Sequence, residues 1–456
     1  MVDAPRFGTD GIRGAANREL TPEVALALGR ATVEVLGGDV VVVGSDPRRS
    51  GPMLEGALTA GICSVGVDVE PLGVVPTPAV AWAAADRKAP AAMISASHNP
   101  FGDNGIKVFA PGGMKLGDDD QAALEARYLA LLAGRSAPEP GHPTGEVGTV
   151  RPTTGVAGWL DLVTGSVSGD ALAGMRMVID CANGAASELG PEPFRRLGAD
   201  VVVIGDRPDG RNINAGFGST ATEALQAAVI AEGAAAGLAF DGDADRLIAV
   251  DDAGRVVDGD RVLALLAADW ASSGRLTGNT VVVTVMTNLG FHRAMAAKGI
   301  EVVATRVGDR HVLEAIESGG LSLGGEQSGH VICRDLATTG DGVLTGVQLL
   351  DVVARSGRSL AELAAESMDR VPQVLRNVRL PGPVADPAAA LTDRVAAIEA
   401  AFGDDGRVLV RASGTEPLLR IMVEHLDPGT ADRACADLVA AAEAAFPADR
   451  PSSNPR

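Results

Sequence analysis

Three aspartates alternate with small residues in the segment D-G-D-A-D-R, from Asp241 to Arg246. In an extended loop this spacing points the three carboxylates to one side, where they repel one another unless a cation joins them. A hard divalent ion is the natural partner, and Mg²⁺ is favoured because it accepts a few carboxylates together with phosphate oxygens. The segment lies between two apolar stretches, Gly237–Phe240 and Leu247–Val250, which argues against an ordinary acidic solvent loop.

Two other acidic motifs share part of this pattern. An EF-hand loop requires Gly at its sixth position and Glu at its twelfth, where this sequence has Arg246 and Asp252. A D-x-D nucleophile of the haloacid dehalogenase type continues with Thr or Val at the position that Asp245 occupies. The EF-hand is therefore rejected, and the aspartyl nucleophile fits less well than a metal site.

A second candidate site is the turn I-S-A-S-H-N-P, Ile94–Pro100. The apolar run Ala91–Ile94 predicts a buried strand that ends at this turn, so Ser97 is expected where open α/β sheets bind ligands. An ordinary polar turn would explain this loop taken alone, and only the other polar loops strengthen the case for Ser97. Further along, Asn104-Gly105 predicts a hairpin turn, and Lys107 in the following strand could point back toward Ser97.

Arginines and glycines gather in two further segments. R-A-S-G-T-E-P, Arg411–Pro417, is followed by Arg420 and combines two guanidinium groups, two hydroxyls and exposed backbone N–H groups, which is typical of a phosphate cradle. F-G-T-D-G-I-R-G, Phe7–Gly14, lets the backbone near Arg13 approach an anion, although an ordinary glycine-rich turn is equally compatible. The sequence has no Walker loop and no convincing G-x-G-x-x-G, so nucleotide-dependent kinases and dinucleotide dehydrogenases lose support.

Apolar strands alternate with helices around these loops. Three α/β units each place a polar loop after an apolar strand, and residues 372–387, rich in proline, predict a linker and the start of a small, different final domain. The predicted fold is α/β, with three similar α/β domains that have mixed sheets and a smaller C-terminal α+β domain, arranged around a central cleft. The expected boundaries are 1–150, 151–252, 253–370 and 371–446, with a disordered tail at 447–456.

Composition limits the function classes. Hydrophobic residues make up 46% of the 456 residues but aromatics only 3%, so the cores must consist of Val, Leu, Ile and Ala. The net charge of -20 argues against nucleic acid and anionic membrane as partners. The four cysteines are far apart and form no C-x-x-C pair, which disfavours zinc ligation and disulfides and favours a reducing cytosol. Neither a signal peptide nor a membrane span is expected.

Five motifs together resemble those of the α-D-phosphohexomutase superfamily, in the family's order and over nearly the whole chain. They are F-G-T-D-G-I-R-G, S-A-S-H-N-P, D-G-D-A-D-R, G-E-Q-S-G-H and R-A-S-G-T-E-P. Within the superfamily the sequence is most similar to the branch of bacterial phosphoglucosamine mutases, because of I-S-A-S-H-N-P, G-G-E-Q-S-G-H-V-I and T-T-G-D-G at 338–342. His311 stands where that branch has Tyr.

The resemblance implies a cytoplasmic isomerase that interconverts glucosamine 6-phosphate and glucosamine 1-phosphate for UDP-N-acetylglucosamine and peptidoglycan synthesis. Ser97 would carry the phosphoryl group as phosphoserine, and one Mg²⁺ per subunit would be bound by Asp241, Asp243, Asp245 and the phosphoryl group on Ser97. Glucosamine or glucose 1,6-bisphosphate would serve as intermediate or activator. The partners implied are small sugar phosphates and a second copy in a homodimer, with no nucleic acid and no membrane.

The resemblance also implies roles for further residues. Arg246 would offset charge during transfer, His98 and Lys107 are candidates for moving the hydroxyl proton, and Arg13 for contacting phosphoserine or substrate. Glu326 and Ser328 would bind the ring hydroxyls at carbons three and four, while His330 would shape its loop. The phosphate already on the sugar would bind to Arg411, Ser413, Gly414, Thr415 and Arg420.

Three alternatives remain at this level. A phosphomannomutase or phosphoglucomutase would use the same mechanism on another sugar. A non-catalytic sugar-phosphate-binding protein would be expected to lack one of the serine, aspartate or arginine positions, all of which are filled. A phosphatase would require that water reach phosphoserine 97 readily, which domain closure over the site should prevent.

Overall fold

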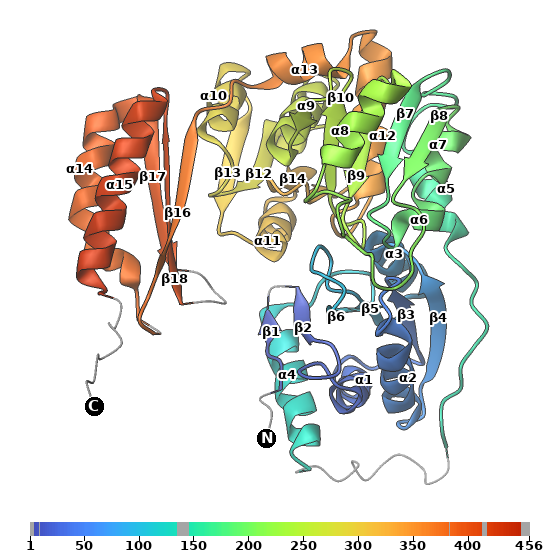
Figure 1. The fold of residues 1–456 in the computed structure, drawn as a ribbon. Coiled ribbons are helices and arrows are strands. Elements are labelled where there is room, and N and C mark those ends of the chain that lie inside the picture. The colour runs from blue at the N-terminus through green and yellow to red at the C-terminus, as the bar shows by residue number, and fades with distance from the viewer. Residues whose placement is uncertain (1–3, 9, 135–145, 383, 413–416, 448–456) are drawn as a thin grey trace, which may run out of the picture. The chain divides into compact units, whose positions relative to one another are not determined.

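The computed structural model describes residues 4–8, 10–134, 146–382, 384–412 and 417–447. The chain forms two compact units, Met1–Thr284 with Gly299–Ser367, and Val285–Lys298 with Met368–Arg456. The first unit contains three sheets with helices, and the second contains one smaller sheet (Figure 1). None of the described helices has the length and hydrophobicity that a bilayer-spanning segment needs.

Each of the three sheets in the first unit contains the same four-strand arrangement. The first and second strands pair in parallel, the third pairs in parallel with the other side of the first, and the fourth runs antiparallel to the third. These quartets are β3–β6, β7–β10 and β12–β15, and β1, β2 and β11 extend the first two sheets at their edges. The prediction of three similar α/β units with mixed sheets is therefore confirmed.

The strands of the first unit are β1 (Phe7–Gly8), β2 (Gly11–Ala15), β3 (Val40–Ser45), β4 (Asp68–Val74), β5 (Ala91–Ile94), β6 (Asp103–Phe109), β7 (Arg176–Asp180), β8 (Asp200–Ile204), β9 (Ala236–Phe240), β10 (Leu247–Asp251), β11 (Val256–Val257), β12 (Thr280–Thr284), β13 (Glu301–Thr305), β14 (Leu323–Gly325) and β15 (Val331–Cys333). Its helices are α1 (Pro22–Leu36), α2 (Gly51–Cys63), α3 (Thr77–Arg87), α4 (Asp118–Leu132), α5 (Ala157–Gly165), α6 (Ala186–Leu189), α7 (Glu192–Arg196), α8 (Glu223–Glu232), α9 (Gly259–Ser272), α11 (Asp309–Gly319), α12 (Gly342–Ser356) and α13 (Leu360–Ser367).

In each quartet a polar loop follows the third strand. The Ser97 loop joins β5 to β6, Asp241–Arg246 joins β9 to β10, and Glu326–His330 joins β14 to β15. The three loops thus occupy equivalent positions in three copies of one strand order, at the carboxyl end of a parallel strand, where α/β sheets bind ligands.

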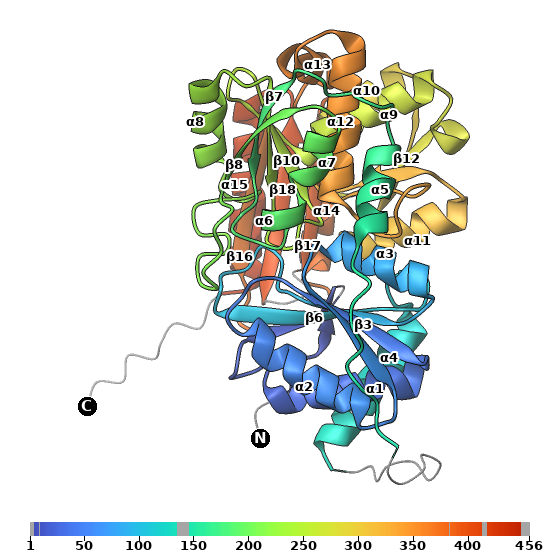
Figure 2. The same cartoon turned by 90° about the vertical axis from the view of Figure 1, so that its right-hand side faces the viewer.

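Helices cover both faces of the first sheet, with α1 and α2 on one face and α3 on the other (Figure 2). Helix α1 begins after Thr21, whose hydroxyl accepts a hydrogen bond from Val24 N–H. The core between sheet and helices is aliphatic, as the low aromatic content requires, and Leu28, Leu54 and Leu58 are fully buried in it. A sheet packed on both sides holds the ends of its strands, and hence the Ser97 loop, in fixed positions.

The second unit is built on a three-stranded antiparallel sheet of order β16-β18-β17. Leu419, Ile421 and Val423 face its core, which includes residues of α14 and α15 on one side of the sheet (Figure 1). Asn288 donates a hydrogen bond of 2.8 Å to the buried carboxylate of Glu424 on β18, which ties the segment before α10 to this strand. The elements are α10 (Leu289–Ala297), β16 (Gln373–Arg379), α14 (Thr392–Phe402), β17 (Gly406–Ala412), β18 (Leu418–His425) and α15 (Pro428–Ala445).

Two local predictions are wrong. The region predicted as a linker, 372–387, contains strand β16, which pairs along its whole length with β18; prolines border this edge strand and do not replace it. Asn104-Gly105 is not a hairpin turn but lies inside β6. Gly105 is needed for close packing, since a Cβ there would lie 2.5 Å from the carbonyl oxygen of Ser95.

Candidate active site

Ser97 lies in the loop between β5 and β6, and neighbouring loops enclose its side chain. The residue is 1% exposed and has a φ of 53°, a left-handed conformation that costs energy for a residue with a side chain. Its hydroxyl donates a hydrogen bond to the carboxylate of Asp241 and lies 3.2 Å from Nδ1 of His98. The structure therefore brings a serine hydroxyl of the first sheet to the first of the three aspartates in the second.

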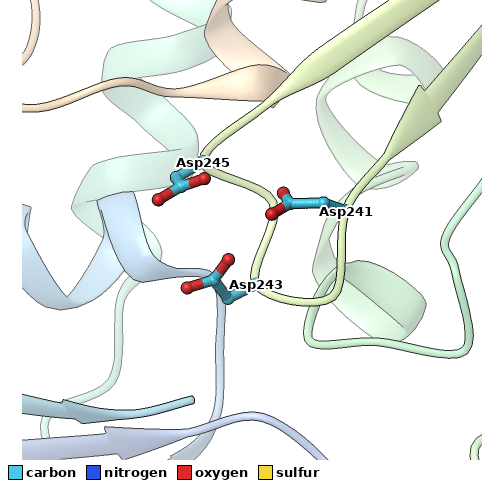
Figure 3. Close-up of side chains that lie close together, drawn as sticks. All are labelled: Asp241, Asp243 and Asp245. Atoms are coloured by element: carbon cyan, nitrogen blue, oxygen red, sulfur yellow. The ribbon is translucent and has the colours of Figure 1, made fainter. Parts of the chain in front are cut away.

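The carboxylates of Asp241, Asp243 and Asp245 converge from the loop between β9 and β10. One oxygen from each lies within 4.8 Å of the others, and all three residues are buried. Figure 3 shows the three carboxylates turned toward a common space. Ala244, between the second and third aspartates, has a left-handed φ of 58° that bends the loop.

This donor set fits a hard divalent cation. Oδ1 of Asp243 and Oδ1 of Asp245 are buried and have no hydrogen-bond partner among the described residues. Burial, followed by repulsion from Asp245 and Asp243, raises the pKa of Asp241 well above its ordinary value. Buried carboxylate oxygens that repel one another and lack donors are stabilised by a cation with a preference for oxygen ligands.

Lys107 contributes positive charge to the aspartate cluster. Its Nζ lies 2.8 Å from Asp243 and 2.9 Å from both Asp245 and Asp10. Burial alone would lower the pKa of Lys107, but Asp10, Asp243 and Asp245 together raise it well above its ordinary value. At neutral pH Lys107 is thus an ammonium group, which neutralises charge and cannot accept a proton in this arrangement.

His98 has the opposite electrostatic character. Burial, followed by the positive charges of Arg246 and Arg13, lowers its pKa to about 4. The imidazole is therefore neutral at neutral pH, and a neutral ring can accept a proton. His98 therefore stays a candidate for moving the hydroxyl proton.

Arg13 lies in β2 and reaches the cluster through Asp10. Its Nη2 is 2.6 Å from Asp10, which also pairs with Lys107 and, at 2.6 Å, with Lys115. Asp10 is a member of this cluster that sequence reasoning missed, although it belongs to the same glycine-rich motif as Arg13.

The loop between β14 and β15 contacts the aspartate loop through the backbone. Leu247 N–H donates to the carbonyl of Gly329 at 3.0 Å. Gly329 has a φ of 90°, and a Cβ there would lie 2.0 Å from the carbonyl oxygen of Leu247, so this contact requires glycine. The side chain of Glu326 accepts a hydrogen bond from Gly308 N–H at 3.1 Å, while Ser328 is exposed.

Arg246 and His330 join the aspartates to this third loop. Burial lowers the pKa of Arg246, but Asp245, Asp241 and then Glu326 raise it well above its ordinary value. Nδ1 of His330 lies 3.7 Å from Asp245, and its Nε2 accepts a hydrogen bond of 3.2 Å from Gly340 N–H. The His330 side chain thus joins its loop to Gly340 and faces the aspartate cluster, and its role in shaping the loop stays a prediction.

The second unit contains the predicted arginine pair. Arg411 and Arg420 lie directly opposite each other on β17 and β18, so their side chains share one face of the sheet. Two like charges directly opposite repel each other, and an anion between them would remove this repulsion. Ser413, Gly414 and Thr415 lie outside the described residues.

Three further residues near Ser97 and Asp243 were missed by sequence reasoning. Thr77, the first residue of α3, donates from its hydroxyl to Asp243 at 2.7 Å. Arg48 and Asn214 both donate to the carbonyl of Ser97 at 2.9 Å. A possible signal was present only for Arg48, which follows the buried strand β3 within the polar run Asp46-Pro47-Arg48.

Comparison with known proteins agrees with this geometry. Four domain families of phosphoglucomutase/phosphomannomutase match the chain: α/β/α domain I at residues 4–133, domain II at 158–254, domain III at 258–371 and the C-terminal domain at 375–441. The chain belongs to the phosphoglucomutase/phosphomannomutase family. The family matches include every loop of the cluster around Ser97 and the arginine pair.

Similar members of this family share most of the chain. A phosphoglucosamine mutase of Desulforudis audaxviator is 52% identical over 428 residues, which cover 92% of this chain and 93% of that protein. A phosphoglucosamine mutase of Acidothermus cellulolyticus is 53% identical over 437 residues, covering 93% of each chain. Among solved structures, a phosphoglucomutase/phosphomannomutase family protein of Burkholderia thailandensis has a TM-score of 0.80 and 28% identity, covering 98% of both chains.

Proposed function

We propose that this chain is a phosphoglucosamine mutase, an isomerase that interconverts glucosamine 6-phosphate and glucosamine 1-phosphate. Two phosphoglucosamine mutases that are 52% and 53% identical to it support the substrate. The observation that carries the chemistry is the hydrogen bond from the Ser97 hydroxyl to Asp241, within a buried triad of aspartates. This contact supports the proposal that Ser97 carries the phosphoryl group next to a bound cation.

In the proposed reaction, Ser97 carries a phosphoryl group that it gives to the free hydroxyl of the sugar phosphate. The bond between phosphorus and Ser97 Oγ breaks, and a bond forms to the sugar oxygen. The sugar proton passes to the neutral imidazole of His98, whose Nδ1 lies 3.2 Å from Ser97 Oγ and returns a proton to it, so that Ser97 leaves as a hydroxyl. Lys107, which is buried, and Arg246, which is partly exposed, are both cationic and stabilise the negative charge on the group in transit. Arg13 orients the phosphoryl group or the substrate.

Asp241, Asp243, Asp245 and the phosphoryl group on Ser97 would hold one Mg²⁺. When bound, the ion supplies charge neutralisation for the phosphoryl oxygens. The chain's own contribution is to hold three carboxylates within 4.8 Å of one another in a buried loop. The residues therefore fit the ion that the family's chemistry requires.

The second half of the reaction returns a phosphoryl group to Ser97 from the other end of the sugar. The bisphosphate must therefore turn over between the two transfers. Arg411 and Arg420, with Ser413, Gly414 and Thr415, would bind the phosphate that is not reacting. Glu326 and Ser328 would bind the ring hydroxyls at carbons three and four, whose positions are nearly equivalent after a half-turn.

We further propose glucosamine or glucose 1,6-bisphosphate as the activator that first phosphorylates Ser97. The product would enter UDP-N-acetylglucosamine and peptidoglycan synthesis in the cytoplasm. A homodimer and the domain boundaries near residues 150, 252 and 370 stay predictions. Light scattering would test the homodimer, and limited proteolysis would test the domain boundaries.

The test of the substrate is a side-by-side assay of glucosamine, glucose and mannose phosphates with Mg²⁺ and a catalytic amount of bisphosphate. We expect kcat/KM for the amino sugar to exceed the other two at least tenfold. The second candidate is a phosphomannomutase or phosphoglucomutase, which the family descriptions and the Burkholderia thailandensis protein favour. A preference for glucose or mannose phosphate would replace the substrate and leave the mechanism in place.

A further inference from the structure

Arg48 holds the backbone of the Ser97 loop. It is 1% exposed and lies shortly after β3. Its guanidinium makes five hydrogen bonds of 2.5 to 3.2 Å: Nε to Asp46, Nη1 to the carbonyls of Pro100 and Asp103, and Nη2 to the carbonyls of Ser97 and Asn99. A guanidinium has five N–H groups, so all of them are used, four on one short stretch of backbone.

Asn214 reaches the same backbone from the second sheet. Its Nδ2 donates to the carbonyl of Ser97 at 2.9 Å and to that of Asn99 at 3.0 Å. The aspartate loop packs against the same point, because a Cβ on Gly242 would lie 2.4 Å from the Ser97 carbonyl oxygen. The Ser97 carbonyl is therefore where the loops of the two sheets meet.

The other side of the Ser97 backbone is also held. Its N–H donates to the hydroxyl of Ser95 at 2.9 Å, and that hydroxyl donates to Asp46 at 2.6 Å. Asp46 in turn accepts from Arg48, so a single buried pair supports both the N–H and the carbonyl of Ser97. These contacts fix the φ of 53° that directs the hydroxyl to Asp241.

We infer that Arg48 and Asn214 are positioning residues for phosphoryl transfer, which hold Ser97 in its left-handed conformation through its carbonyl. The inference rests on the proposed function, in which Ser97 carries the phosphoryl group. Within the described part of the chain, the hydrogen bonds of Arg48 and Asn214 do not involve the Ser97 hydroxyl, Glu326 or Ser328. Their loss should therefore lower kcat and leave KM unchanged, because an alignment needed for transfer is lost while substrate contacts persist.

Three variants separate positioning from general stability. Asn214→Ala removes both donors of a side chain that is only partly buried, at a φ of 58° that alanine adopts less readily than asparagine. Arg48→Lys keeps the positive charge, but an ammonium has only three N–H groups for five acceptors, so charge alone should not rescue the enzyme. Arg49→Lys is the matched control, because this neighbouring side chain is exposed.

Steady-state assays give kcat and KM. Intact-mass analysis follows the rate at which a hexose 1,6-bisphosphate phosphorylates Ser97. Hydrogen exchange is measured in the peptide covering residues 95–104. For Asn214→Ala and Arg48→Lys we expect kcat and the phosphorylation rate to fall at least tenfold and KM to stay within threefold. In the unphosphorylated form of these two variants, the rate of backbone hydrogen exchange in this peptide should rise at least tenfold. The Arg49→Lys control should stay within twofold of the wild-type protein in each measurement.

Wild-type kcat and wild-type exchange in Asn214→Ala would overturn the inference, as would a rise in KM without a fall in kcat. Should Arg48→Lys fail to fold, Asn214→Ala decides. If no hexose 1,6-bisphosphate phosphorylates the wild-type protein, the proposed function is overturned, and the catalytic part of the inference with it. The exchange measurement distinguishes the two failures, since it reports the loop's support without any reaction.

Discussion

Thr77 holds the second ligand of the proposed cation site, and its hydroxyl can be removed with little change in shape. The hydroxyl donates to Oδ2 of Asp243 at 2.7 Å, and the backbone N–H of Thr77 donates to the carbonyl of Asp243 at 2.9 Å. Both residues are fully buried. Thr77→Val keeps the volume and the backbone contact and removes only the hydroxyl, so Asp243 keeps Lys107 as the partner of Oδ2.

The expected loss follows from the strength of this hydrogen bond. A hydrogen bond to a charged acceptor contributes about 1.5–3 kcal/mol, and about 1.4 kcal/mol corresponds to a tenfold change in a binding constant. Because partners that orient metal ligands typically affect affinity about 10- to 100-fold, we expect the Kd for Mg²⁺ to rise by this factor in Thr77→Val. Calorimetric titration with Mg²⁺ or Mn²⁺, and the Mg²⁺ dependence of turnover at saturating sugar phosphate, measure the change.

Thr32→Val is the matched control. Thr32 is buried in α1, and its hydroxyl donates to the carbonyl of Leu28 at 2.9 Å, away from the aspartates. This variant should lose some thermal stability and keep the Mg²⁺ affinity of the unchanged chain. A folded Thr77→Val protein whose Mg²⁺ affinity lies within twofold of the unchanged chain would refute the reasoning.

Three further outcomes are expected. Ser97→Ala should abolish turnover and leave the melting temperature nearly unchanged; near-normal activity would exclude the phosphoserine mechanism. Arg411→Gln should raise KM for the sugar phosphate about tenfold or more, since a charge-assisted contact to phosphate is lost, with far-UV circular dichroism as the folding control. Burial raises the pKa of Asp180 to about 6 from 3.8. The folded protein therefore binds this proton more tightly than the unfolded chain does, which stabilises the fold by about 3 kcal/mol below about pH 4. This contribution is lost as the pH rises through 6. Asp180→Asn should therefore flatten the decline of melting temperature between pH 4 and 7; an unchanged slope would contradict this assignment.

The sequence predicts those parts of the site that local patterns encode. Asp241, Asp243 and Asp245 alternate within one short loop, so their convergence needs only the loop's own geometry. Ser97 follows an apolar run whose strand bounds, Ala91–Ile94, are as predicted. Such signals depend on neighbours in the chain, and the spacing of residue types is enough to find them.

Supporting residues could not be found in this way. Thr77 contacts Asp243 across 166 positions of the chain, and Asn214 contacts Ser97 across 117. Nothing in the segments around Thr77 or Asn214 differs from ordinary helix starts and loops. The proline-bordered strand β16 was mistaken for a linker for a related reason, because its pairing with β18 depends on residues far along the chain.

The repeated strand order explains how one design supports three kinds of chemistry. In each of the three sheets the loop after the third strand is free to vary, because the strands on either side carry the packing. One copy carries Ser97, the proposed phosphoryl carrier, the next carries the three aspartates, and the third carries Glu326 and Ser328, which we propose bind the sugar hydroxyls. Hydrogen bonds between loops join the copies: Asn214 to the Ser97 carbonyl at 2.9 Å, and Leu247 to the Gly329 carbonyl at 3.0 Å. Because these contacts use backbone groups, the side chains at the loop tips remain available. A chain with a net charge of -20 can thus concentrate cations, the buried Lys107 and the partly exposed Arg246, where a phosphoryl group would be transferred.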